Sequence, residues 1–228
     1  MKTNNSTQST AAEMNLIGGR LCLDFANTVG GRRSGAASGK PDASTQVLSD
    51  KLNDYFDLVA WSRNAGILTE DEEQALLRES RRRRVEAAAV FERAVALREA
   101  IYRICKATLS GGQPKVADLE TLNGELLQAR SHERFARAAD SFTWEWVDAK
   151  KAPDRMLWPV ARSAAEFLIG ADLSRLRECG GADCGWLFED VSRNRSRQWC
   201  DMQDCGNRAK VRRFRTRMRK AKKGRYSS

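Results

Sequence analysis

Apolar residues recur at the helical period of 3.6 through most of the first 170 residues of this 228-residue chain. Thr69 and Glu72 form a capping box, which predicts a helix start, and the basic run Arg81–Arg84 marks a break or bend in the long tract that follows. The pattern predicts a helix over residues 51–65, with Leu52, Tyr55, Phe56, Leu58 and Val59 on its apolar face. It predicts further helices over residues 69–109, 114–129 and 156–169.

The hydrophobic period changes to two between the last two of these helices. Phe142, Trp144 and Trp146 alternate with polar residues, and residues 133–138 can form the facing strand, with a turn near residues 139–141. The sequence therefore predicts a mainly α fold of the α+β type, in which a helical N-terminal domain carries a small β-hairpin.

The last quarter of the chain has a pattern of its own. Trp186, Leu187 and Phe188 favour extended structure, so residues 175–179 and 185–190 are expected to pair in a hairpin. After Gly206 no Pro or Gly interrupts the chain through Lys223. One helix is expected there, and the side that it turns outward is expected to be fixed by an apolar stripe made of Val211, Phe214, Met218 and Ala221.

Polar segments divide the chain. Residues 1–13 predict a disordered lead, and the glycine-rich residues 30–44 predict a flexible loop that lacks the spacing of a phosphate-binding loop. We expect a helical domain over residues 14–172 and a small finger over residues 173–228. No apolar run approaches the length of a membrane span and the opening residues are polar, so we expect a cytoplasmic protein.

Four cysteines occur in two pairs, each with four residues between its members, and fifteen residues separate the pairs. Two short loops of this kind can bring four thiolates onto one tetrahedral zinc ion, a closed site that has no open position for chemistry. The alternative is that these cysteines are buried free thiols, which is the interpretation we favour for Cys22 and Cys105. The predicted ligands of one structural zinc are Cys179, Cys184, Cys200 and Cys205. With the predicted hairpin and helix, they suggest a treble-clef-like or ribbon-like finger.

The excess of positive charge lies beside these cysteines. Residues 175–228 contain 16 Lys and Arg against 6 Asp and Glu, and subtracting these from the chain totals of 40 and 30 leaves 24 against 24 for residues 1–174. Phosphate polymers are the expected partners of such a surface, and nucleic acid is favoured over a membrane surface because the helical stripe has one bulky aromatic residue. Some arginines are also expected to neutralise the zinc-thiolate cluster or to form solvated faces.

The basic residues fall into two candidate groups. Arg193, Arg195 and Arg197, in the loop between the cysteine pairs, are candidate phosphate contacts. Asn207, Arg208 and Arg212, near the helix start, are candidates for reading bases. The remaining candidate nucleic-acid-binding residues follow along the helix and are Lys210, Arg213, Arg215 and Arg219.

Two motifs resemble known families. The tail, with Phe188-Glu189-Asp190 and Cys205-Gly206-Asn207-Arg208, resembles the CGNR zinc finger, and the segment from Gly19 to Thr28 resembles the opening signature of the ABATE domain that precedes this finger in bacterial proteins. The resemblance implies a stress-linked bacterial transcription regulator whose finger binds DNA and whose four cysteines hold zinc.

One polar cluster in the first domain invites a functional interpretation. Asp24 and Asn27 or Thr28 would share a helix face, where they could bind a small effector or could bond backbone groups inside the fold; the structural role is favoured. No enzyme is expected, since the single His132 belongs to neither a zinc-protease nor a deaminase pattern and no set of nucleophile, base and orienting group is recognisable.

The preferred function is therefore a DNA-binding regulator with a helical sensor in front and a zinc-built finger behind, compatible with a homo-oligomer. The alternative from another class is an RNA-binding or ribosome-associated protein that uses the same finger. Trp186 and Trp199 argue against RNA, because they sit where a small finger needs its core. We expect residues 14–170 to fold without the finger and, because their charges cancel, not to bind nucleic acid.

Overall fold

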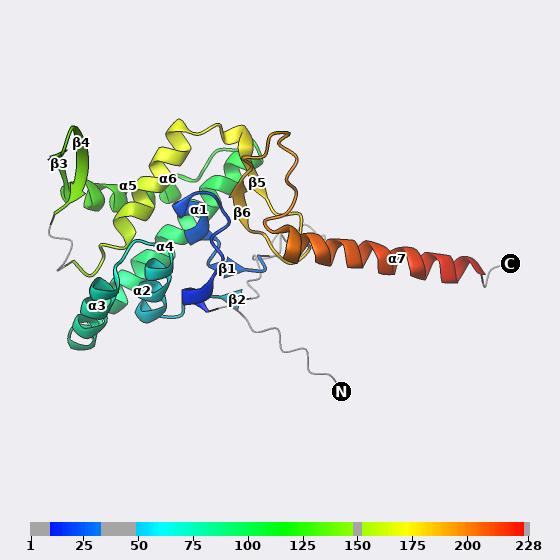
Figure 1. Cartoon of the computed structure of the whole chain (residues 1–228), viewed down its shortest axis with the longest axis horizontal. Helices are drawn as coiled ribbons and strands as arrows, with labels where there is room; N and C mark the ends of the chain where they lie inside the picture. The colour runs from blue at the N-terminus through cyan, green and yellow to red at the C-terminus, as the bar shows by residue number, and fades with distance from the viewer. Residues whose placement is uncertain (1–9, 33–48, 148–151, 226–228) are drawn as a thin grey trace.

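The computed structural model describes residues 10–32, 49–147 and 152–225. Within them the chain is mainly helical, and α7, which comprises Asn207–Arg225, projects from a compact helical body (Figure 1). The helices of the body are α1 (Leu21–Ala26), α2 (Tyr55–Asn64), α3 (Glu70–Arg82), α4 (Arg84–Leu109), α5 (Val116–Ser131) and α6 (Leu157–Gly170). The paired strands are β1 (Val29–Gly30) with β2 (Ser49–Asp50), β3 (Glu133–Ala138) with β4 (Ser141–Trp146), and β5 (Leu176–Glu178) with β6 (Leu187–Glu189).

The 26-residue α4 is the centre of the helical body, and α1, α2, α3, α5 and α6 all pack against it. The predicted capping box is present, because Thr69 accepts from the Glu72 amide and the Glu72 carboxylate accepts from the Thr69 amide. The long tract breaks at Arg83, inside the predicted run of arginines, where the backbone leaves helical geometry. The helices predicted from the apolar period are thus confirmed to within a few residues at their ends.

The prediction is wrong for one residue of the apolar face of α2. Phe56 lies about 100° around the helix from Tyr55 and is exposed, while Trp61, which the pattern did not select, is fully buried against Phe25 with ring centroids 4.9 Å apart.

The chain is ordered earlier than expected. Residues 1–9 of the predicted disordered lead lie outside the described residues, but Ala11–Glu13 form a 3₁₀ turn that packs on α2. Ala11 and Met14 are buried there, and the Asn64 side chain donates to the Met14 carbonyl over 2.8 Å. Burial of these two apolar side chains explains why the ordered part of the chain begins before the predicted boundary. Of the predicted loop over residues 30–44, Gly30 pairs in β1, Gly31 and Arg32 follow it, and the rest lies outside the described residues.

The hairpin β3–β4 has the predicted strands and turn, and it lies at the opposite end of the molecule from α7 (Figure 1). Phe135 stacks on Phe142 and meets Trp144 edge-on, and all three rings are exposed. Trp146 turns toward the body and contacts Trp158, which is buried in α6.

The second hairpin, β5–β6, shares the core of the helical body. Leu176 and Leu187 are fully buried in the same cluster as the core residues of α1, α4 and α6. The hydrophobic core therefore continues across the domain boundary expected at residue 172.

No helix of the described residues is both long and apolar enough to cross a membrane.

Candidate metal centre and basic groove

The four predicted cysteines come together in one buried cluster. Cys179 follows β5, Cys184 closes the turn before β6, and Cys200 ends the loop that leads to a π-helical turn, Met202–Gly206, which contains Cys205. Their sulfur atoms all lie within 4.8 Å of one another, with 3.5 Å between Cys184 and Cys200. Four convergent thiol groups at this separation fit the corners of one structural zinc ion.

The surroundings of the sulfur atoms also fit a bound metal. The amides of Gly181 and Cys200 donate to Cys179 Sγ over 3.4 and 3.3 Å, and Arg208 donates to Cys205 Sγ over 3.2 Å. Gly181 has no side chain where a Cβ atom would lie 3.2 Å from Cys205 Sγ. Donors aimed at the sulfurs stabilise the thiolate form that zinc needs, and they orient the ligands.

One residue of the polar cluster at the end of α1 contacts the finger. The Asn27 amide donates to the Leu187 carbonyl and accepts from the Leu187 amide, each over 2.8 Å, so it satisfies the free edge of β6. Asp24 accepts from the Gly18 amide over 2.8 Å, and Thr28 donates to the Phe25 carbonyl over 2.8 Å. All three candidate effector residues are buried with partners inside the fold, which is the structural role favoured from the sequence.

Further contacts fasten the finger to the body. Arg20 pairs with Glu189 over 2.6 Å, and the Glu189 amide donates to the Gly18 carbonyl over 2.8 Å. Trp186 donates to the Val29 carbonyl over 3.0 Å, and Lys106 of α4 pairs with Glu178 of β5. The opening motif of the helical domain thus forms much of the surface on which the finger packs. We call this surface the seat of the finger. Sequence reasoning missed this role because the partners lie about 160 residues apart and no local signal joins them.

Replacing Asn27 should loosen this seat. Asn27→Ala leaves the amide and carbonyl of Leu187 without partners in a site where Asn27 is 1% exposed, so we expect the free energy of unfolding to fall by about 2–4 kcal/mol. Urea unfolding followed by far-UV circular dichroism measures it. Asn123→Ala, on the exposed face of α5, is the matched control and should change stability by less than about 0.5 kcal/mol. An equal effect of the two substitutions would contradict the assignment.

Two of the candidate nucleic-acid residues also make contacts inside the finger. Arg197 donates to the carbonyls of Trp199, Ile17 and Cys200, and its guanidinium lies 4.3 Å from the centre of the Phe188 ring. Arg208 contacts Asp204 as well as the Cys205 sulfur. These contacts hold the Arg197 guanidinium against the finger, whereas 66% of the Arg208 side chain is exposed. The roles of Arg197 as a phosphate clamp and of Arg208 as a base reader stay predictions.

The other candidates remain near or at the surface. Arg195 pairs with Asp172 over 3.1 Å, and Asn207 donates to the Gln203 carbonyl over 2.8 Å while its side chain stays exposed. The fully surface-lying candidates are Arg193, Lys210, Arg212, Arg213, Arg215 and Arg219.

A shallow groove of about 470 Å³ runs between the finger loop and the first turns of α7. We call it the basic groove and define it by Arg177, Arg195, Arg197, Trp199, Arg212 and Arg213. Trp199 is half-buried in its wall, with the Arg213 guanidinium 5.9 Å from the ring centre. Glu178 also lines the groove, and Lys106 neutralises it.

The apolar stripe of α7 does not dock on the body. Val211, Phe214 and Met218 are 49, 64 and 50% exposed, and α7 extends away from the helical body (Figure 1). The expectation that this stripe fixes the outward side of the helix is therefore wrong for the described side chains, because all three are about half exposed or more; the side chain of Ala221 lies outside those described.

Comparison with known families covers both parts of the chain. Residues 19–171 match the ABATE family model, described as "Putative stress-induced transcription regulator", and residues 175–218 match the CGNR zinc finger model. No curated protein matches the chain.

Proposed function

The chain belongs to the ABATE family and ends in a CGNR zinc finger, and from this premise we propose that it regulates transcription by binding DNA through the basic groove and α7. The observation that carries the proposal is the basic groove itself, in which five arginines from three separated segments face one surface. Arginine is the residue best suited to hold phosphate groups, because its planar fork can donate two hydrogen bonds at once.

The two halves of the surface suit two kinds of contact. The groove is shallow and lies beside the zinc cluster, so its arginines are suited to phosphates, which fix position on the duplex. The 19 residues of α7 extend over about 28 Å, and its described side chains apart from Ala209 are exposed. An α-helix fits the major groove of B-DNA. Asn207, Arg208 and Arg212 remain the candidates for base readout. The proposed role includes no catalytic step. A regulator that binds DNA in this way is expected in the cytoplasm, at the nucleoid.

Salt-dependent binding tests the proposal. Arg193→Ala and Arg213→Ala should each weaken binding equally on a selected and a scrambled duplex, and should each lower the salt slope by about 0.9, because each removes one phosphate contact. Arg212→Ala should weaken binding to the selected duplex by an extra 1–3 kcal/mol or so. Fluorescence anisotropy at several salt concentrations measures both effects.

Arg134→Ala is the control for these variants. Arg134 lies on the β3–β4 hairpin, where it pairs with Glu145 at the far end of the molecule, so its loss should leave DNA affinity unchanged. If Arg134→Ala weakens binding as much as Arg213→Ala, the contact surface is not the basic groove. Discrete intergenic peaks in a chromatin pull-down are expected for the full chain.

RNA is the second candidate, favoured by one observation. Trp199 packs on the cysteine cluster, as expected, but it is only half-buried in the wall of the basic groove. Its accessible part could stack on an unpaired base, which favours RNA. Trp199→Ala should weaken binding to single-stranded RNA and spare duplex DNA if RNA is the partner. Recovery of RNA without DNA enrichment in the pull-down would favour this candidate.

A further inference from the structure

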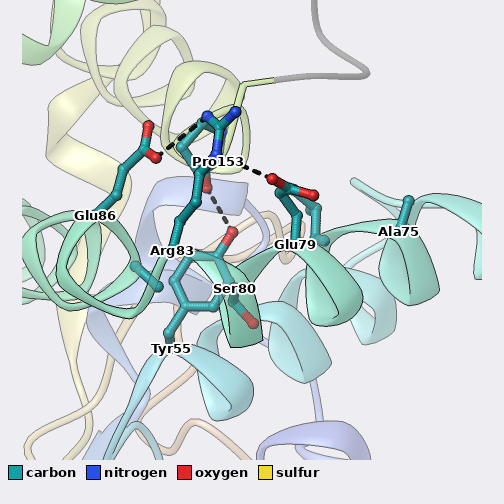
Figure 2. A pocket seen from close by; sticks show the side chains of 9 residues that line it. Tyr55, Ala75, Glu79, Ser80, Arg83, Glu86 and Pro153 are labelled. Atoms are coloured by element: carbon teal, nitrogen blue, oxygen red, sulfur yellow. Dashed lines mark hydrogen bonds and ion pairs between the residues drawn. The ribbon is translucent and has the colours of Figure 1, made fainter.

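A second pocket lies far from the finger, between α2, α3 and the first turn of α4 (Figure 2). Its volume is about 440 Å³, within the range of pockets that hold small organic ligands. The apolar part of the wall is formed by Ala75, Leu76, Ala87 and Pro153, and the polar groups are Tyr55, Glu79, Ser80, Arg83 and Glu86.

The polar groups of this pocket accept hydrogen bonds and, apart from Arg83, have none to donate. Tyr55 already donates its hydroxyl hydrogen to the Pro153 carbonyl over 2.8 Å, and Ser80 donates its own to the Leu77 carbonyl over 3.1 Å. Their lone pairs remain available, and the carboxylates of Glu79 and Glu86 are acceptors only. A ligand that fits this lining must therefore bring donors.

The charge of the lining favours a cation. Arg83 lies between the two carboxylates (Figure 2). It is 2.9 Å from Glu79 and 3.4 Å from Glu86, so two negative charges of the lining face one positive charge. Arg82 reaches Glu79 from outside the pocket at 3.8 Å and is largely exposed. Burial raises the pKa of the Tyr55 hydroxyl, and the carboxylates of Asp154 and Glu86 raise it further, as expected where the potential is negative.

We propose that this pocket binds a small organic cation, an ammonium group carried on an apolar body. The ammonium lies between Glu79 and Glu86, where the exposed Arg83 now sits, and the apolar body lies against Leu76, Ala87 and Pro153. Arg83 has more than half of its side chain exposed, so it can swing into solvent as the ligand enters. Binding here is independent of nucleic acid, so the site and the proposed function can fail separately.

Three probes of one shape and different charge test the proposal on the full chain without nucleic acid. They are phenethylammonium, neutral 2-phenylethanol and phenylacetate. Titration followed by ligand-detected NMR should show saturable binding of the ammonium in the millimolar range, as expected for so small a ligand, and at least about tenfold weaker binding of the other two.

Variants place the binding. Glu79→Gln with Glu86→Gln should weaken phenethylammonium binding at least about tenfold, because both charged acceptors are lost. Ala75→Trp, which fills the pocket from its wall, should also abolish it. Glu92 is an exposed carboxylate on α4, the helix that carries Glu86. Glu92→Gln is therefore the matched control and should bind phenethylammonium as the parent does. Absence of ammonium binding, equal binding of phenylacetate, or unchanged binding in the double variant overturns the proposal.

Discussion

Cys200→Ala is expected to leave the purified protein without zinc and to unfold the segment between residues 190 and 206. Four buried sulfur atoms within 4.8 Å of one another fit the ligand set of one shared zinc ion, which holds their segments together. Structural zinc in small modules contributes on the order of 10–16 kcal/mol to folding, which exceeds any other single interaction in the finger. Metal analysis and limited proteolysis measure the two effects.

The matched control is another buried cysteine. Cys105 lies in the core of α4, is free of the cluster, and has its pKa raised by burial, so it is an inert thiol. Cys105→Ala should keep one zinc per chain and should keep the tail resistant to protease. If the parent protein holds no metal, and Cys200→Ala leaves the proteolytic resistance of the tail unchanged, the cluster is not a metal site.

Loss of zinc should unfold the loop of the finger but leave its β5–β6 hairpin in place. Asn27 and Arg20 hold β6 from the helical body without help from the metal, and Leu187 stays in the shared core. The β5–β6 hairpin is therefore expected to remain seated in Cys200→Ala while the loop and α7 detach. Far-UV circular dichroism should show that the helices of the body persist.

The parts of the fold that sequence predicted well are those with local causes. The capping box at Thr69 and Glu72, the break at Arg83 and the β3–β4 turn each depend on residues within a few positions of one another. The cysteine cluster was predictable for a similar reason, because its pairs have short spacings that allow few other arrangements.

The parts that sequence did not predict depend on partners distant in the chain. Asn27 has no neighbour that marks it as the cap of β6, and Arg197 looks like any other basic loop residue until its carbonyl partners surround it. On α2, Trp61 is buried in place of Phe56 because it packs against the ring of Phe25, a contact that a periodic pattern cannot include. Each of these features depends on tertiary packing.

Two truncations of different length should differ in stability. The shorter fragment should not fold, whereas the longer one should. A chain that ends at Ser174 lacks Leu176 and Leu187, both fully buried in the main core, and it exposes the seat around Asn27. Loss of a buried leucine side chain costs about 2–5 kcal/mol, and the total stability of a domain is about 5–15 kcal/mol. The fragment should therefore aggregate or melt without cooperativity, contrary to the independent folding that the sequence suggested.

A chain that ends at Lys210 is the matched control and isolates the role of α7. It keeps the four cysteines and the buried Ala209, and the described side chains that it loses are exposed, so its melting temperature should stay near that of the full chain. It lacks nine basic residues, which are Arg212, Arg213, Arg215, Arg217, Arg219, Lys220, Lys222, Lys223 and Arg225. The formal net charge falls from +10 to +1, since no acidic residue is lost with them.

Binding separates the two roles of the tail. Loss of several phosphate contacts should lower the affinity of the chain ending at Lys210 for duplex DNA by roughly a thousandfold at low salt and should flatten its salt dependence. Calorimetry and anisotropy on both truncations make the comparison. If the Ser174 fragment melts cooperatively at the temperature of the full chain, the finger is an independent domain despite the shared leucines. If the Lys210 fragment keeps full affinity, the nucleic-acid surface lies outside the part of α7 that follows Lys210.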